Sequence, residues 1–93
     1  MSKIIIEDRK IIEELEALQY EVQSRQALLS YMINTNIHHN ESFDRYEKEY
    51  FEKFKAYEYK KSELENKYIK PMAAEEVRAW NLIFNSGEVY INE

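Results

Sequence analysis

Two long heptad registers constrain the fold of this chain more than any other feature. Between residues 11 and 32, seven positions recur at alternating spacings of four and three residues, with Arg25 as their polar member: Ile11, Leu15, Leu18, Val22, Arg25, Leu29 and Met32. A second register spans residues 43–68: Phe43, Glu47, Tyr50, Phe54, Tyr57, Lys61, Leu64 and Tyr68. Such spacing places side chains along one side of an α-helix, so the sequence predicts two helices with apolar seams.

The segment between the two registers favours a turn. Residues 34–40 read Asn-Thr-Asn-Ile-His-His-Asn, and short polar side chains compete with the helix for backbone hydrogen bonds. Pro71 disfavours helical backbone in the residue before it, which ends the second helix near Lys70. Because so short a connection leaves the helices as antiparallel neighbours, we expect a helical hairpin with its turn inside residues 33–42.

The residues after Pro71 predict a third, shorter helix. Ala73, Val77, Trp80 and Phe84 recur at spacings of four, three and four residues. Residues 89–91 then read as a short terminal strand. The alternative is a β-hairpin that pairs residues 82–84 with residues 89–91 across an Asn-Ser-Gly turn.

The N-terminal residues have two interpretations. Three consecutive isoleucines at positions 4–6 either extend the first helix, which is our expectation, or form a short strand that ends before Asp8, a helix N-cap.

Composition agrees with an all-α fold. The 93 residues include one Gly and one Pro, whereas folds with many turns need more of both. We therefore expect a single helical domain over residues 1–93. The absence of Cys excludes disulfides, thiolate metal sites and a cysteine nucleophile.

Charge and hydropathy exclude two classes of partner. A net charge of −5 has the wrong sign for a protein that binds nucleic-acid phosphates. The longest purely apolar run covers residues 4–6, whereas a membrane-spanning helix needs about 20 apolar residues and a signal peptide about 7–15. We expect a cytoplasmic protein that binds neither nucleic acid nor membrane.

The sequence contains no strong catalytic or metal-binding pattern. The adjacent histidines His38 and His39 can share a metal ion only on irregular backbone, and neither has a Glu three positions before it, as helix-bundle carboxylate sites require. Phosphate-binding loops, nucleophile elbows and His-Glu-x-x-His motifs do not occur. We therefore expect no metal, no cofactor and no enzymatic activity from this chain alone.

Aromatic residues are concentrated on the predicted second helix. Eight of them lie between positions 43 and 68, and Tyr46, Phe51 and Tyr59 fall outside its heptad register. Either the C-terminal segment covers them or they form an interface, in which aromatic residues are enriched. We assign Tyr46, Phe51, Tyr59 and Trp80 as candidate interface residues.

The sequence thus favours a small helical interaction module that forms a homo-oligomer, with a dimer favoured, or docks on a protein partner. The alternative is a non-catalytic accessory subunit or acidic inhibitor-like regulator of one enzyme. A metal-carboxylate helical protein is the least favoured hypothesis.

Overall fold

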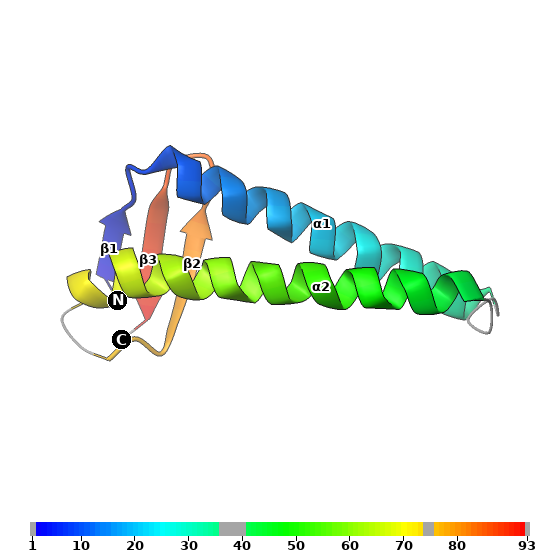
Figure 1. Cartoon of the computed structure of the whole chain (residues 1–93). Helices are drawn as coiled ribbons and strands as arrows, with labels where there is room; N and C mark the ends of the chain where they lie inside the picture. The colour runs from blue at the N-terminus through cyan, green and yellow to red at the C-terminus, as the bar shows by residue number, and fades with distance from the viewer. Residues whose placement is uncertain (1, 36–40, 74–75, 93) are drawn as a thin grey trace. The chain divides into compact units, whose positions relative to one another are not determined.

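The computed structural model describes residues 2–35, 41–73 and 76–92 and contains two long helices and three short strands (Figure 1). The helices are α1 (Arg9–Asn34) and α2 (Glu41–Leu64), and α2 continues into a π-helical turn, η1 (Glu65–Ile69), and a 3-10 turn, η2 (Lys70–Met72). The strands are β1 (Ser2–Ile5), β2 (Ala79–Ile83) and β3 (Glu88–Asn92). The predicted helical hairpin is confirmed, because α1 and α2 pack against each other. Its connection, residues 36–40, lies outside the described residues.

The predicted third helix is wrong, and the all-α assignment is right only in part: the structure is mostly helical but also contains a three-stranded antiparallel sheet. β2 and β3 form a β-hairpin across the Asn-Ser-Gly turn, as in the alternative, but it pairs residues 79–83 with residues 88–92 and leaves Phe84 in the turn. β1 pairs with the other side of β3, giving an antiparallel sheet of order β1-β3-β2. Trp80 lies opposite Ile91, and Leu82 opposite Val89. Trp80 and Phe84 are four residues apart, a spacing that fits a helix but also a strand followed by a turn. The pairing of β3 with both β1 and β2 favours the strand over the helix.

Residues 4–6 do not extend the first helix, contrary to expectation. Ile4 pairs with Val89 in the sheet, where consecutive β-branched side chains are favoured. Asp8 then begins α1 as an N-cap, since its Oδ1 accepts hydrogen bonds from the backbone N–H groups of Lys10 (3.2 Å) and Ile11 (3.4 Å).

Gly87 closes the turn between β2 and β3. Its φ of 78° lies in the left-handed region, and its carbonyl accepts a 2.8 Å hydrogen bond from the Ile6 N–H. A Cβ atom here would lie 2.4 Å from the Ile6 carbonyl oxygen. The only glycine of the chain therefore stands where both backbone conformation and space require it.

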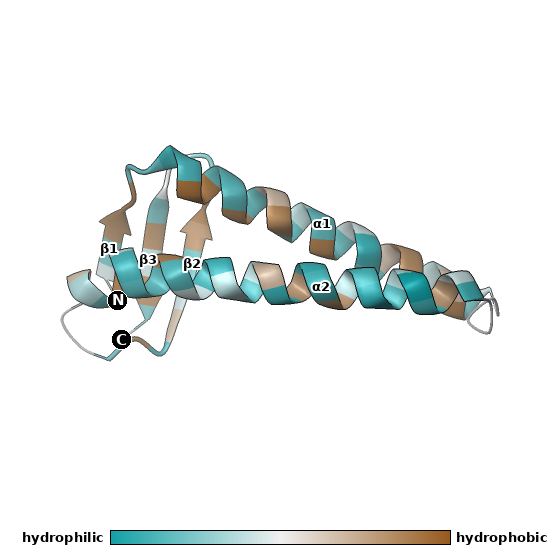
Figure 2. Ribbon diagram, viewed as in Figure 1, coloured by the Kyte–Doolittle hydropathy of each residue, from teal (hydrophilic) through white to brown (hydrophobic). Residues whose placement is uncertain are grey.

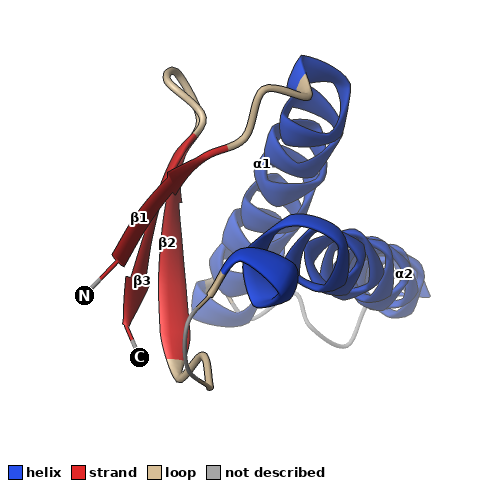
Figure 3. Ribbon diagram, turned by 90° about the vertical axis from the view of Figure 1, so that its left-hand side faces the viewer, coloured by secondary structure: helices blue, strands red, loops and turns tan. Residues whose placement is uncertain are grey.

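The chain forms two compact units. The sheet unit comprises Met1–Glu16 and Lys60–Glu93, and the helical unit comprises Ala17–Tyr59. In the sheet unit the helical segments cover one face of the sheet (Figure 3). Its core includes five side chains that are essentially inaccessible to solvent: Ile12, Leu64, Ile69, Val89 and Ile91.

In the helical unit the α1 seam is as predicted. Val22 and Met32 are buried, and Leu18, Arg25 and Leu29 are half-buried. The Arg25 guanidinium forms an ion pair with Glu21 one turn earlier on the same helix. A polar residue is thus accommodated in the seam by a partner on its own helix.

The α2 seam differs from the predicted register. Glu47 and Phe54 are exposed, whereas Tyr46 and Lys53 are half-buried together with Tyr50 and Tyr57. Lys53 replaces Phe54 because a lysine stem can cover apolar surface while its ammonium stays in water. Figure 2 shows that α2 is mostly hydrophilic, whereas hydrophobic segments are more frequent on α1.

Candidate functional site

The four predicted interface residues lie in different surroundings. Phe51 is 52% exposed and Tyr59 is 74% exposed. Tyr46 is half-buried, with the Arg45 guanidinium 5.0 Å from its ring centre. Trp80 lies half-buried on β2 in the sheet unit, with the Lys61 ammonium 5.5 Å from its ring centre. Of the four predicted interface residues, only Phe51 and Tyr59 are largely exposed, and both lie in the helical unit.

The exposed ring of Phe51 has an aromatic neighbour, Tyr50, which belongs to the α2 seam. The Tyr50 ring lies 5.4 Å from the Phe51 ring, edge to face, and 6.1 Å from the Phe54 ring, stacked. Phe54 is 39% exposed and not part of the seam. Phe51 and Phe54 together form an exposed strip that we call the aromatic flank of α2.

The adjoining side of α1 carries no charge over the same stretch. Counting 100° per residue from the α1 seam places Gln19, Gln23 and Gln26 on one flank of that helix. Each of these glutamines directly follows a seam residue of α1, just as Phe51 and Phe54 directly follow seam residues of α2. In an antiparallel pair of right-handed helices, the residues that follow the seam lie on the same side of the hairpin in both helices. The glutamines therefore extend the aromatic flank into a wider uncharged surface of the helical unit.

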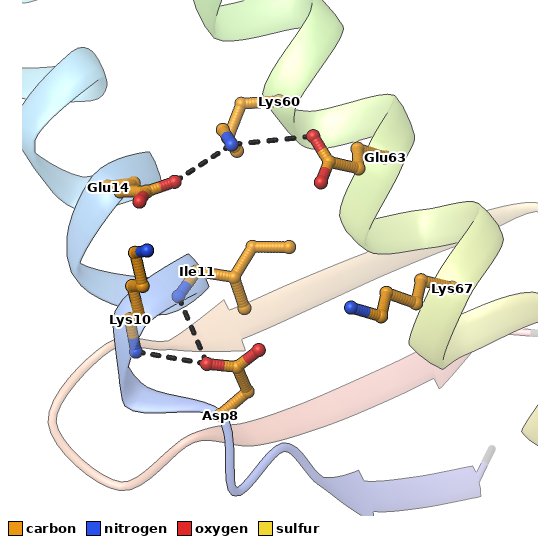
Figure 4. Close-up of a pocket in the computed structure, with 7 residues that line it drawn as sticks. All are labelled: Asp8, Lys10, Ile11, Glu14, Lys60, Glu63 and Lys67. Atoms are coloured by element: carbon orange, nitrogen blue, oxygen red, sulfur yellow. Dashed lines mark hydrogen bonds and ion pairs between the residues drawn. The ribbon is translucent and has the colours of Figure 1, made fainter.

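A second feature is an open cleft of about 400 Å³ in the sheet unit, lined mainly by charged residues (Figure 4). Its lining comprises Asp8, Lys10, Ile11, Glu14, Lys60, Glu63 and Lys67. The Lys60 ammonium lies 2.8 Å from a Glu14 carboxylate oxygen and 3.4 Å from a Glu63 carboxylate oxygen. Its hydrogen bond to Glu14 raises the pKa of Lys60 and lowers the pKa of Glu14.

The cleft has the chemistry of an ion-pair network. The charges of its three carboxylates and three ammonium groups sum to zero. The raised pKa of Lys60 and the lowered pKa of Glu14 both favour the ionised forms that make up the ion pair. Within residues 2–35, 41–73 and 76–92 no group of three or more His, Asp or Glu residues could hold a metal ion. His38 and His39 lie outside these ranges. We assign the cleft a structural role that joins the start of α1 to the end of α2.

Asp8 connects this network to the fold. The Tyr68 hydroxyl donates a 2.8 Å hydrogen bond to Asp8 Oδ2, and this bond is the main reason that the pKa of Asp8 lies below 3.8. The two backbone N–H groups that Asp8 caps lower the pKa further. Folding therefore stabilises the ionised form of the Asp8 side chain relative to its protonated form.

This shift gives the protein a defined acid sensitivity. A depressed folded-state pKa contributes stability that is present above the unfolded pKa and is lost as the pH falls through the folded value. We expect the melting temperature of the wild type to fall between about pH 5 and pH 2 more steeply than that of Asp8→Asn, measured by circular dichroism. Tyr68→Phe, which removes the main cause of the shift, should give an intermediate slope. Equal slopes for all three proteins would contradict the role assigned to Asp8.

No described helix is long and apolar enough to span a bilayer. Comparison of the chain with protein-family models, curated proteins and solved structures finds no match.

Proposed function

We propose that the protein is a helical interaction module that self-associates through the aromatic flank, with a two-fold dimer as the simplest assembly. The observation that supports this proposal most directly is the exposure of Phe51 and Phe54 beside each other on α2. Exposed contiguous apolar surface on small proteins commonly marks an interaction site. In this proposal the chain has no catalytic chemistry of its own, since the charges of its cleft already neutralise one another.

The surroundings of the flank suit such a contact. Association through this surface buries aromatic rings at little cost in side-chain entropy. Interface cores contain few charged residues, and the flank of α1 with Gln19, Gln23 and Gln26 is likewise uncharged. Glu47 and Glu58 are exposed near Phe51 and Phe54 and would form a polar rim. The same surface presented by a second copy meets the requirement of a two-fold interface for self-complementarity.

Paired substitution of the flank tests this proposal. Burying one phenylalanine contributes about 1.5–3 kcal/mol, so Phe51→Glu/Phe54→Glu should raise the dissociation constant of the aromatic contact by at least roughly 100-fold. Sedimentation velocity over a concentration series measures the change. Circular dichroism should show that the helix content is retained, because neither side chain belongs to the seam.

Tyr20→Glu is the matched control. Tyr20 is an aromatic residue, 69% exposed on α1, and helical periodicity places it on the side of that helix away from its seam. The control should associate like the wild type. A wild type that stays monomeric at high micromolar concentration, or a control that dissociates as fully as the flank variant, would refute self-association through this surface.

A further inference from the structure

A second surface for self-association lies at the free edge of β1. In the sheet order β1-β3-β2, β1 pairs with β3 on one side, and no described strand pairs with its other side. The hydrogen bond from the Ile6 N–H to the Gly87 carbonyl fixes which backbone groups face β3. Because alternate residues of a strand point their N–H and C=O groups in opposite directions, those of Ile4 face β3 and those of Lys3 and Ile5 face the free edge.

The free edge is accompanied by an apolar groove. A groove of about 580 Å³ follows residues 3–8, and Tyr68 and Met72 form its other wall. Ile5 is 61% exposed and Met72 is 68% exposed. Unpaired backbone groups beside exposed apolar side chains are the features that accept an added β-strand.

The sequence of this edge is complementary to itself. Residues 3–7 read Lys-Ile-Ile-Ile-Glu. If two copies pair antiparallel about Ile5, Lys3 of each copy lies opposite Glu7 of the other, and the two Ile5 residues face each other. Opposite charges in directly opposed positions stabilise antiparallel pairs, whereas a parallel arrangement would place like charges together.

Backbone parity agrees with this register. Lys3, Ile5 and Glu7 are alternate residues, so in an extended strand they share the direction in which the backbone groups of Ile5 point, toward the free edge. Their side chains likewise share one face of the sheet, and those of Ile4 and Ile6 share the other. Lys3 already lies 3.4 Å from Glu88 on its own chain, yet its side chain is 51% exposed and can also reach a second carboxylate.

We propose that β1 pairs with β1 of a second copy, which joins two three-stranded sheets into one six-stranded antiparallel sheet. This contact does not depend on the aromatic flank. A chain with both contacts has two distinct two-fold interfaces and assembles beyond a dimer.

Proline scanning of β1 in the Phe51→Glu/Phe54→Glu background tests the β1 contact alone. This background should still form dimers. Adding Ile5→Pro removes an N–H group that faces the free edge, so it should yield a folded monomer, whereas Ile4→Pro removes a hydrogen bond to β3 and should unfold the sheet. Sedimentation velocity and thermal unfolding separate the two results.

Charge reversal provides a second test that does not alter the backbone. Lys3→Glu and Glu7→Lys should each raise the dissociation constant of the β1 dimer by roughly tenfold, because two cross-strand pairs become repulsive. The double variant should return it to within about threefold of the starting value. A background protein that is already monomeric, an Ile5→Pro variant that still dimerises, or a double variant no tighter than either single variant would overturn the β1 proposal. A wild type whose association depends on Ile5 but not on Phe51 and Phe54 would instead overturn the aromatic flank.

Discussion

Replacing Leu64 with alanine should lower the free energy of unfolding by about 2–5 kcal/mol, the usual cost of a buried Leu-to-Ala change. Leu64 is completely buried in the sheet unit at the end of α2. The core of this unit also contains Ile12 of α1, Ile69 of η1, and Val89 and Ile91 of β3. The Leu64 side chain is 0% exposed, so truncation to alanine removes buried methyl groups and leaves a cavity in this core. Chemical denaturation followed by circular dichroism measures the change.

Phe54→Ala is the informative comparison. The heptad count alone places Phe54 in the seam and therefore predicts a loss as large as that of Leu64. In the structure its ring is 39% exposed, so we expect a loss of about 1 kcal/mol or less when measured on the monomer. A larger loss for Phe54→Ala than for Leu64→Ala would mean that the heptad register, and not the observed seam, describes the packing of α2.

The helices could be predicted because their signals are local. The α1 register from Ile11 to Met32 repeats over six intervals, and the polar segment after it leaves the helix few favourable continuations. The helix ends were predicted less well. Residues 4–6 were expected to extend the first helix, whereas Asp8 caps it, and α2 ends at Leu64, not near Lys70, with Pro71 inside a 3-10 turn. One sequence was sufficient for the existence of both helices but not for where they begin and end.

The sheet could not be predicted in the same way, because its partners are far apart in the chain. β1 pairs with β3, so Ile4 meets Val89 across more than 80 positions of sequence. In isolation the run at residues 4–6 fits a helix or a strand, and so does the segment around Trp80. Only the pairing itself decides, although the Asn-Ser-Gly sequence before β3 did indicate a turn.

The exposure of the candidate interface residues was predicted in part. Phe51 and Tyr59 were identified as off-register aromatics, and both are exposed. Phe54 was missed because the register placed it in the seam between Tyr50 and Tyr57, whereas the observed seam has Lys53 at that point. A count that chose Lys53 over Phe54 for this seam position, with the lysine stem packed and its ammonium solvated, would have left Phe54 exposed.

Replacing Gly87 with alanine should lower the free energy of unfolding by about 2–5 kcal/mol. The left-handed conformation costs an L-residue with a Cβ roughly 1–2 kcal/mol, and losing the hydrogen bond between Ile6 and Gly87 adds about 1–3 kcal/mol when its groups stay buried. The added carbon would meet the Ile6 carbonyl oxygen at 2.4 Å, and a backbone atom cannot rotate away as a side chain can. Denaturant titration measures the loss, and Asn85→Ala, an exposed change in the same turn, should remain within about 0.5 kcal/mol of the wild type.

Gly87→Asn separates the two causes. Asparagine tolerates the left-handed region better than alanine does, so it should recover stability if backbone conformation is the main problem. It carries the same Cβ, however, and meets the same Ile6 oxygen. We therefore expect Gly87→Asn to recover at most the conformational part of the loss, about 1–2 kcal/mol, and to stay clearly less stable than the wild type, because close packing of β1 against the turn also requires glycine. Recovery by asparagine to near wild-type stability would show that β1 can move away from the turn, and that the Ile6–Gly87 contact is not what fixes the position of β1 beside β3.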